Sequence, residues 1–278
     1  MKKNIVIVGL GLIGGSLAKA LSSRTEHTVT GIDVSPDVLE RALSEGAIHS
    51  IGTPDSLREA DLVLLCIYPE AAVSFIEEYG HLIPKDCVVA DTCGIKGEIC
   101  RRMPPLAQRF GFTFIGCHPM AGKEKNGFSA SEAELFQGAS FIIVPCGAPE
   151  EYVKEIEDLA LSLGFGQTVI TTPEHHDRMI AYTSQLPHVL ACAYVMSPQC
   201  LQHNGFSAGS YRDVSRVARI NEVLWTELFL DNAVPLTEEL DLLIENITAL
   251  RDTVAEGRRD DLRGLLRKGR LIKEQLGE

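Results

Sequence analysis

One histidine stands where its chemistry could be used: His118, in the stretch "GCHPMAG". It directly follows the apolar run 113–117, which is typical of a buried strand. An unperturbed histidine has a pKa of about 6.5, so the neutral ring can accept a proton at neutral pH. Hydride transfer from a carbon that bears a hydroxyl group requires the hydroxyl proton to leave, and His118 fits this task. The alternative is a structural histidine that only caps the strand.

A glycine pattern near the N-terminus indicates a dinucleotide site. Gly9-x-Gly11-x-x-Gly14 follows the apolar run 4–8 and opens a helical pattern. The first glycine permits a tight turn, the second lets the backbone approach a pyrophosphate, and the third allows close packing of helix on strand. Asp33 ends the next apolar run, where a carboxylate receives the ribose hydroxyls and repels a 2′-phosphate. The pattern predicts NAD as the cofactor; a glycine-rich turn without a nucleotide is the alternative.

Two further strand ends should lie at the same edge, because ligands bind at the carboxyl ends of parallel strands. "YP" at 68–69 ends one apolar run, where an ordinary strand-to-helix turn is the alternative, and "DTCGIK" at 91–96 ends the next. The stretch that contains Thr92, Cys93 and Gly94 should therefore also face the cofactor. Cys93 as a nucleophile would need a nearby base and a lowered thiol pKa, and the sequence shows neither. The predicted cofactor contacts are Gly9, Gly11, Leu12, Ile13, Gly14, Asp33, Tyr68, Pro69 and Asp91.

The C-terminal part carries cations and an aromatic residue at helical spacing. Arg212 and Arg216 are i, i+4 neighbours, a spacing suited to clamping a carboxylate, and Trp225 follows them. A solvated basic face is the alternative. His176 and His188 share one predicted helix, but their separation turns them roughly 120° apart, so they need not share a face. No carboxylate or cysteine spacing completes a metal site, and we predict none.

Strand and helix patterns alternate as far as residue 170 and then give way to helices alone. Short apolar runs between helical patterns predict an α/β fold with a parallel, doubly wound sheet of the Rossmann type. Pro173 can open a helix, so we place the domain boundary there. We predict a dinucleotide-binding domain over residues 1–171 and an all-α substrate-binding and dimerisation domain over residues 172–278. Helices this long commonly pack against a second copy; a self-contained helical cap is the alternative.

The expected elements can be bounded from the apolar periodicity. A loop and a short amphipathic helix are expected between the fifth and sixth strands. The predicted strands cover residues 4–8, 28–32, 62–67, 87–90, 113–117, 140–144 and 167–170. The predicted helices include residues 12–21, 36–44, 70–79, 150–163, 173–196, 210–219, 221–232, 233–256 and 260–275.

Composition limits the class of protein. The chain has 278 residues and a formal net charge of −12, which argues against a nucleic-acid binder, because such proteins need basic surface. Its eight cysteines include no CxxC pair, and several sit in apolar runs, as reduced buried thiols do. Polar residues resume soon after the N-terminal apolar stretch, so we expect no targeting signal. No run is long enough for a membrane span, and we expect a cytoplasmic protein.

Five motifs, in order along nearly the whole chain, resemble those of the prephenate dehydrogenases of tyrosine biosynthesis. The most specific is His-Pro-Met-Ala-Gly-x-Glu-x-x-Gly, and the least specific is the glycine fingerprint. The motifs are "VGLGLIGGSLA", "ADTCGIKGEI", "GCHPMAGKEKNG", "HDRMIAYTSQLPHVLA" and "YRDVSRVA…LW". The resemblance implies oxidative decarboxylation of prephenate to 4-hydroxyphenylpyruvate with NAD as hydride acceptor, by a homodimer that needs no metal.

The resemblance also assigns roles to residues. His118 matches the catalytic histidine that accepts the proton of the ring hydroxyl. Arg216 matches the substrate-binding arginine, and Arg212 occupies a position where the family also has a basic residue. The remaining matches are His188 and Trp225 in the substrate pocket, the latter in some cases reaching it from a partner subunit, and Glu124 and Asp177 at the domain cleft.

The sequence also departs from the family pattern. Many members have a serine at Gly94 whose hydroxyl bonds to the catalytic histidine or the substrate; Thr92, Cys93 or a water could take its place. Gln185 stands where some relatives have histidine, and Lys123 where threonine or serine is frequent. The chain ends soon after the helical half, so we expect any tyrosine feedback to act at or near the active site.

Other functions stay open at this stage. The substrate could be arogenate, which differs from prephenate in carrying an ammonium in place of the side-chain keto group. A β-hydroxyacid dehydrogenase is a further alternative, but its usual second-domain lysine has no good counterpart before Lys268. A dimeric NAD sensor without catalysis is the last, and the presence of His118 argues against it.

Overall fold

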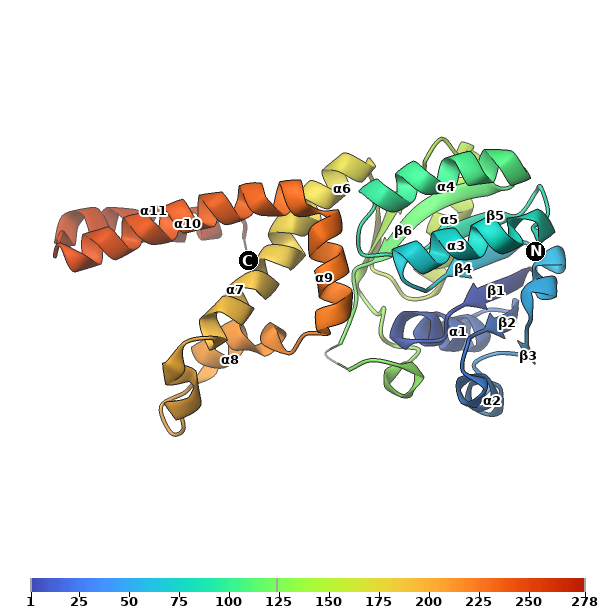
Figure 1. Cartoon of the computed structure of the whole chain (residues 1–278), viewed down its shortest axis with the longest axis horizontal. Coiled ribbons are helices and arrows are strands. Elements are labelled where there is room, and N and C mark those ends of the chain that lie inside the picture. The colour runs from blue at the N-terminus through green and yellow to red at the C-terminus, as the bar shows by residue number, and fades with distance from the viewer. Residues whose placement is uncertain (1, 124, 278) are drawn as a thin grey trace.

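The computed structural model describes residues 2–123 and 125–277, which form an α/β domain and a helical domain (Figure 1). Within these residues one eight-stranded sheet runs in the order β3-β2-β1-β4-β5-β6-β7-β8. β3 was not predicted from the sequence, because its two residues are both exposed and show no apolar periodicity. The strands are β1 (Asn4–Val8), β2 (Thr28–Ile32), β3 (Ser50–Ile51), β4 (Leu62–Leu65), β5 (Val88–Asp91), β6 (Thr113–Pro119), β7 (Ser140–Val144) and β8 (Gln167–Ile170).

Helices cover both faces of this sheet, as predicted for a doubly wound domain. Side chains alternate along a strand, so the buried run of β1 serves two cores. Ile5 and Ile7 belong to the cluster under α1 (Leu12–Arg24), α2 (Pro36–Ser44) and α5 (Glu150–Ser162). Val6 and Val8 belong to the cluster under α3 (Pro69–Tyr79) and α4 (Gly97–Phe110). In Figure 1, α3 and α4 lie above the sheet, and α1 and α2 lie below it.

The sheet is mostly parallel, but β6 and β7 are antiparallel, with Gly116 opposite Val144 and Pro119 opposite Phe141. This reversal was not predicted. A parallel pair needs a crossover, usually through a helix. The segment between these strands instead contains the short 3-10 turn Phe128–Ala130, where a short amphipathic helix was expected.

The helical domain begins at α6 (Pro173–Ile180), capped by the Thr172 hydroxyl. α6 continues through a π-helical turn, Ala181–Gln185, into α7 (Leu186–Val195). Pro187 accounts for this widening: its ring lacks an N–H and clashes with the carbonyl four residues earlier, which lies in the π turn. The predicted helix 210–219 is α-helical only to Ser215 and then tightens into a 3-10 turn. The remaining helices are α8 (Gly209–Ser215), α9 (Glu222–Asp231), α10 (Ala233–Ala255) and α11 (Arg259–Gln275).

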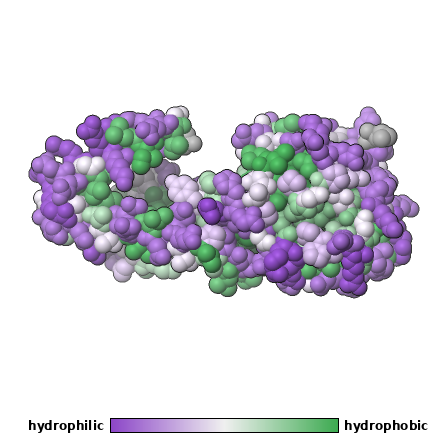
Figure 2. Space-filling view, turned by 90° about the horizontal axis from the view of Figure 1, so that it is seen from above, coloured by the Kyte–Doolittle hydropathy of each residue, from purple (hydrophilic) through white to green (hydrophobic). Residues whose placement is uncertain are grey.

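α10 and α11 form a hairpin that extends away from the sheet (Figure 1). Large apolar side chains on it are exposed, Ile244 by 59% and Leu266 by 60%. Figure 2 shows apolar patches on this lobe among hydrophilic residues. Exposed apolar surface of this extent is typical of a face that another chain covers.

Candidate active site

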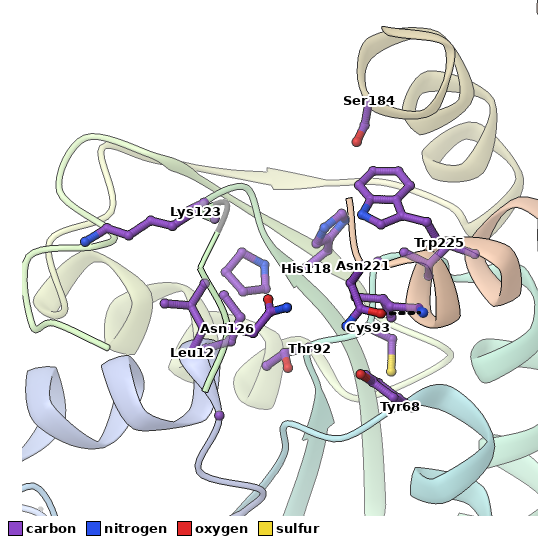
Figure 3. A pocket seen from close by; sticks show the side chains of 18 of the residues that line it. Leu12, Tyr68, Thr92, Cys93, His118, Lys123, Asn126, Ser184, Asn221 and Trp225 are labelled. Atoms are coloured by element: carbon purple, nitrogen blue, oxygen red, sulfur yellow. Dashed lines mark hydrogen bonds between the residues drawn. The ribbon is translucent and has the colours of Figure 1, made fainter. Parts of the chain in front are cut away.

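His118 lies near the end of β6, at the same edge of the sheet as the carboxyl ends of β1, β4 and β5. A cavity of about 590 Å³ opens there against the helical domain. Figure 3 shows the rings of His118 and Trp225 at this cavity, one from each domain. Of the residues predicted from the sequence, those that line it are Gly11, Leu12, Ile13, Tyr68, Pro69, Thr92, Cys93, Gly94, His118, His188, Arg216 and Trp225.

The glycine turn after β1 fits a dinucleotide cofactor. Gly9 has a φ of +91°, and a Cβ at Gly14 would collide with the Gly9 carbonyl oxygen, so both glycines shape the turn from outside the cavity lining. Gly11 has open space where a Cβ would stand, and it precedes α1, whose first turn has no acidic residue. The first amides and the dipole of α1 therefore favour a phosphate.

Asp33 directly follows β2 beside this turn but does not line the cavity. Its carboxylate accepts hydrogen bonds from the amides of Leu10 at 2.7 Å and Ser35 at 2.9 Å. The residue thus fixes the ends of β1 and β2 relative to each other. Its role with the ribose hydroxyls stays a prediction.

Asp91 lies behind the site, fully buried, and not at the cofactor face where it was predicted. Its carboxylate forms an ion pair with the fully buried Lys96, and it accepts bonds from the amides of Cys93 at 2.8 Å and Cys117 at 3.2 Å. Burial is the largest single influence on the Lys96 pKa and lowers it, but the negative charge and hydrogen bond of Asp91, together with the nearby Cys93 and Cys100, raise the Lys96 pKa overall. The charged pair ties the loop after β5 to the residue that precedes His118.

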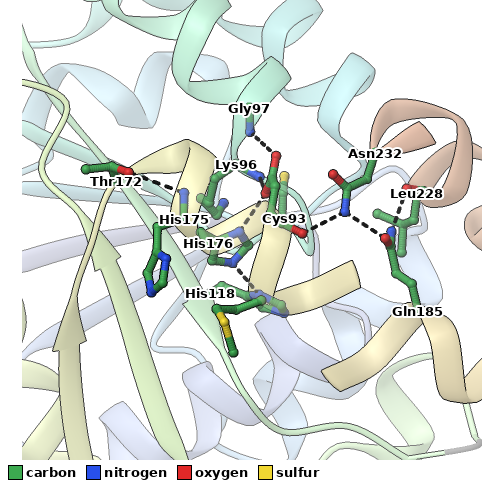
Figure 4. Close-up of polar contacts among 12 residues, drawn as sticks. Cys93, Lys96, Gly97, His118, Thr172, His175, His176, Gln185, Leu228 and Asn232 are labelled. Atoms are coloured by element: carbon green, nitrogen blue, oxygen red, sulfur yellow. Dashed lines mark hydrogen bonds and ion pairs between the residues drawn. The ribbon is translucent and has the colours of Figure 1, made fainter. Parts of the chain in front are cut away.

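A chain of side chains supports His118 from the helical domain (Figure 4). His118 Nδ1 lies 2.9 Å from His176 Nε2, and His176 Nδ1 lies 2.6 Å from Asp177 Oδ1. The Asp177 carboxylate also accepts bonds from the amides of Lys96 at 2.8 Å and Gly97 at 2.7 Å. This contact of His176 was not predicted from the sequence, where the adjacent pair His175-His176 at a helix start is the only signal for it.

The surroundings of His118 keep its ring neutral. Burial lowers its pKa well below the usual 6.5, and the charges of His176 and Lys96 lower it further. The pKa of His176 is also lowered, first by burial, although Asp177 opposes this. A neutral His118 at pH 7 can accept a proton.

The pH dependence of turnover should reflect this lowered pKa. A base is lost when pH falls through its own pKa, so the acid limb of kcat/KM should lie below pH 6.5. The groups that face the base are His176 and Lys96. Initial rates across the acid range, with controls for enzyme inactivation, measure the limb. An acid limb above pH 6.5 would contradict the neutral, desolvated histidine.

Neither Thr92 nor Cys93 donates its side-chain hydrogen to His118 in the place of the family serine, and a contact of either with the substrate stays a prediction. The Thr92 hydroxyl donates to the Leu65 carbonyl at 3.3 Å, and the Cys93 thiol points to the Ile67 carbonyl at 3.7 Å. The Cys93 pKa is raised, first by burial and then by Asp91, so this thiol stays protonated. His176 is the side chain that bonds to His118.

The far wall of the cavity combines an aromatic stack with a cation. The ring of His188 stacks on Trp225 of the same chain, with centroids 3.8 Å apart. His188 Nδ1 donates to the Ser184 carbonyl at 2.7 Å. Burial lowers the His188 pKa, and the charge of Arg216 lowers it further. The wall therefore offers a neutral histidine beside Arg216.

The other residues singled out in the sequence take different places relative to the cavity. Arg212 is exposed outside the lining, so it does not form a clamp there with Arg216. Gln185 is buried and bonds to the Leu228 carbonyl at 2.8 Å and to Asn232 at 2.7 Å. Lys123 lines the cavity and pairs with Glu132 at 2.6 Å. Glu124 lies outside the described residues.

The lining residues that were not predicted include four with polar side chains, Asn126, Ser184, Arg219 and Asn221. Ser184 reaches the cavity from the π turn, which the sequence signals only through Pro187. Asn221 caps α9, where its side chain accepts from the amides of Val223 and Leu224 at 3.2 Å. An asparagine before a helical run is an N-cap signal that could have located it.

Within residues 2–123 and 125–277, no group of three or more His, Cys, Asp or Glu side chains could hold a metal ion. Among the helices of the same residues, none is long and apolar enough to cross a membrane.

These features are those of a two-domain dehydrogenase. The α/β domain has a nucleotide-binding turn, a neutral histidine lies at the same edge of the sheet, and the helical domain adds a positively charged wall. The family model "Prephenate dehydrogenase, nucleotide-binding domain" matches residues 17–173, and "Prephenate dehydrogenase, dimerization domain" matches residues 172–268. The chain belongs to the prephenate dehydrogenase family, whose members act on prephenate, arogenate or related cyclohexadienyl substrates.

Individual relatives agree with this assignment. The chain is 34% identical to the cyclohexadienyl dehydrogenase of Zymomonas mobilis, over 91% of this chain and 89% of the relative. It is 27% identical to the prephenate dehydrogenase of Bacillus subtilis, over 99% and 75%. Its fold matches that of A. aeolicus prephenate dehydrogenase, solved with hydroxyphenyl propionate and NAD+, with a TM-score of 0.87, 23% identity and 99% coverage of both chains. The arogenate dehydrogenase of Synechocystis gives a TM-score of 0.82 at 25% identity, covering 98% and 99%.

Proposed function

We propose that this chain catalyses the NAD-dependent oxidative decarboxylation of prephenate to 4-hydroxyphenylpyruvate in tyrosine biosynthesis. The observation that carries the proposal is the neutral His118, placed between the glycine turn and a wall that contains Arg216. The family membership of both halves supports it and leaves the β-hydroxyacid alternative without support.

Different residues of the chain bind the cofactor and accept the proton. The glycine turn, the start of α1 and Asp33 would hold NAD, which supplies the hydride acceptor. His118 accepts a hydrogen bond from the ring hydroxyl of prephenate through Nε2, because Nδ1 is bonded to His176. It takes the hydroxyl proton as hydride leaves the same carbon. Loss of the ring carboxylate as carbon dioxide leaves an electron pair that makes the ring aromatic, and the phenol oxygen then recovers a proton.

The charge of the lining supports prephenate as the substrate. Among the lining residues that the structure describes, Lys123, Arg216 and Arg219 are fully charged, and all are positive. Prephenate carries two carboxylates that such cations attract. Arogenate would bring its ammonium toward the same cations. It is the second candidate, favoured by the likeness to the Synechocystis arogenate dehydrogenase.

A substrate and cofactor matrix tests the proposal. Initial rates of NADH or NADPH formation at 340 nm are measured with prephenate and arogenate, each with NAD and NADP. The highest kcat/KM is expected for prephenate with NAD. Turnover of arogenate alone would keep the mechanism and change the substrate, and absence of turnover with all four pairs would refute the proposal.

We also propose that the protein is a homodimer formed through the helical domain. The match to a dimerization domain and the exposed apolar residues of α10 and α11 support this. Light scattering should give twice the mass of 30.3 kDa. Ile244→Glu with Leu266→Glu should shift the protein toward the monomer, because a buried unpaired charge is costly. A monomeric wild type would contradict the proposal.

A further inference from the structure

Asp177 is held as an acceptor-only carboxylate. Oδ1 accepts from the Lys96 amide at 2.8 Å, and Oδ2 accepts from the Gly97 amide at 2.7 Å. Gly97 begins α4, a helix of 14 residues, whose N-terminal dipole favours a negative charge. The 2.6 Å contact between Asp177 Oδ1 and His176 Nδ1 therefore requires the proton to sit on Nδ1.

The proton on His176 Nδ1 determines the direction of the hydrogen bond between His176 and His118. A neutral imidazole carries one N–H, so His176 Nε2 is left as an acceptor. His118 Nδ1 lies 2.9 Å from it, and a contact between two ring nitrogens needs one donor and one acceptor. The donor must be His118 Nδ1–H. The other ring nitrogen of His118, Nε2, then carries the free lone pair.

The other two protonation states of His176 are disfavoured. A proton on His176 Nε2 in place of Nδ1 would set a lone pair against the Asp177 carboxylate at 2.6 Å. A doubly protonated His176 would place a cation on a side chain that is 2% exposed and near the buried Lys96, and the His176 pKa is lowered. The neutral Nδ1–H form of His176 satisfies both contacts.

We infer that Asp177 and His176 are positioning residues that fix His118 in its Nδ1–H tautomer and so direct a basic Nε2 at the cavity. The catalytic meaning of this tautomer rests on the proposed function, whereas the tautomer itself does not. The hydrogen bonds run from the Asp177 carboxylate through His176 to His118, so the three side chains form one series. With Gly94 in place of a hydroxyl residue, this series supplies the hydrogen bond to the base.

The series also crosses the domain boundary. His176 and Asp177 belong to α6, whereas His118 lies in β6, which Asp91 contacts through the Cys117 amide while it pairs with Lys96. Asn232 anchors α6 from the other side by donating to the Asp177 carbonyl at 2.9 Å. The orientation of the base therefore depends on the contact between α6 and α4, so a change in domain packing would reach His118.

Nuclear magnetic resonance of the imidazole nitrogens tests the tautomer directly. The full-length protein is labelled with 15N-histidine, and long-range 1H–15N correlations at neutral pH distinguish the two neutral forms. His118→Asn identifies the His118 signals by their loss. The expected result is the Nδ1–H form for both His118 and His176. An Nε2–H form of His118 in the wild type would overturn the inference, whichever substrate the enzyme prefers.

Asp177→Asn provides the second arm. Its side-chain amide can donate to His176 Nδ1, which would move the His176 proton to Nε2 and turn His118 to its Nε2–H form. We expect that tautomer in the spectrum and a kcat lower by about tenfold to 10²-fold, with NAD affinity unchanged. His175→Asn, one residue before the series at an exposed position, should leave both the tautomer and kcat as in the wild type.

The outcomes show whether Asp177 and His176 position His118 or only support the fold. An unchanged His118 tautomer in folded Asp177→Asn, or a changed tautomer with full kcat, would overturn the inference. His176→Gln, which can still accept at the position of Nε2, should retain more activity than His176→Phe, which cannot. Equal losses in those two variants would mean that His176 only fills space. If Asp177→Asn does not fold, the wild-type spectrum and the His176 pair decide the question.

Discussion

Replacing His118 with asparagine is expected to lower kcat by about 10²–10⁴-fold and to leave NAD binding nearly intact. Asparagine keeps a polar side chain at the end of β6 but cannot accept a proton. The lowered pKa of the wild-type ring means that nearly all of the enzyme carries a usable base at pH 7, so its loss removes the full contribution. Single-turnover and steady-state rates with prephenate and NAD measure the effect.

A matched control uses the same substitution far from the cavity. His81 is exposed in the loop after α3, and His81→Asn should retain wild-type kcat and KM. NAD titration and thermal unfolding should show that His118→Asn is folded and binds its cofactor. If His118→Asn turned over within tenfold of the wild type, proton acceptance by His118 would have to be abandoned.

The fold was largely predictable because its signals are local. Continuous apolar runs such as Asn4–Val8 indicate strands covered on both faces, and the structure has this strand as predicted. The direction of β7 was not predictable from its own residues, since a strand buried on both faces reads the same either way. The short helix expected between β6 and β7 concealed the reversal, because a helical connection is what a parallel pair requires.

Site residues were predictable where their position along the backbone alone determines where they lie in the fold. Residues at or directly after the carboxyl ends of strands, such as His118 and Thr92, reached the expected edge. Asp91 did not, because side chains alternate along a strand and its carboxylate turns inward to Lys96. His176 and Arg212 depended on the phase of a helix relative to its neighbours, which tertiary packing sets and the sequence pattern does not.

Arg216→Gln is expected to lower kcat/KM for prephenate by about 10²–10³-fold, mainly through KM. Arg216 lines the cavity beside the stacked pair of His188 and Trp225, opposite His118. A guanidinium bonds a carboxylate through two parallel N–H groups, and its loss leaves a desolvated substrate charge unpaired, at a cost of about 3–4 kcal/mol. The kcat/KM of Arg216→Lys should lie between those of the wild type and Arg216→Gln, because a lysine supplies the positive charge but not two parallel N–H donors.

Arg212→Gln is the matched control for this prediction, because it removes the same charge one helical turn earlier. Arg212 is exposed outside the cavity lining, so its loss should change kcat/KM by less than about threefold, through long-range attraction alone. The comparison separates a specific carboxylate contact from the general effect of positive charge in an acidic protein. Equal losses in both variants would support the two-arginine clamp expected from the i, i+4 spacing and would mean that substrate binding draws Arg212 inward. A loss in Arg212→Gln alone would move the carboxylate site away from Arg216.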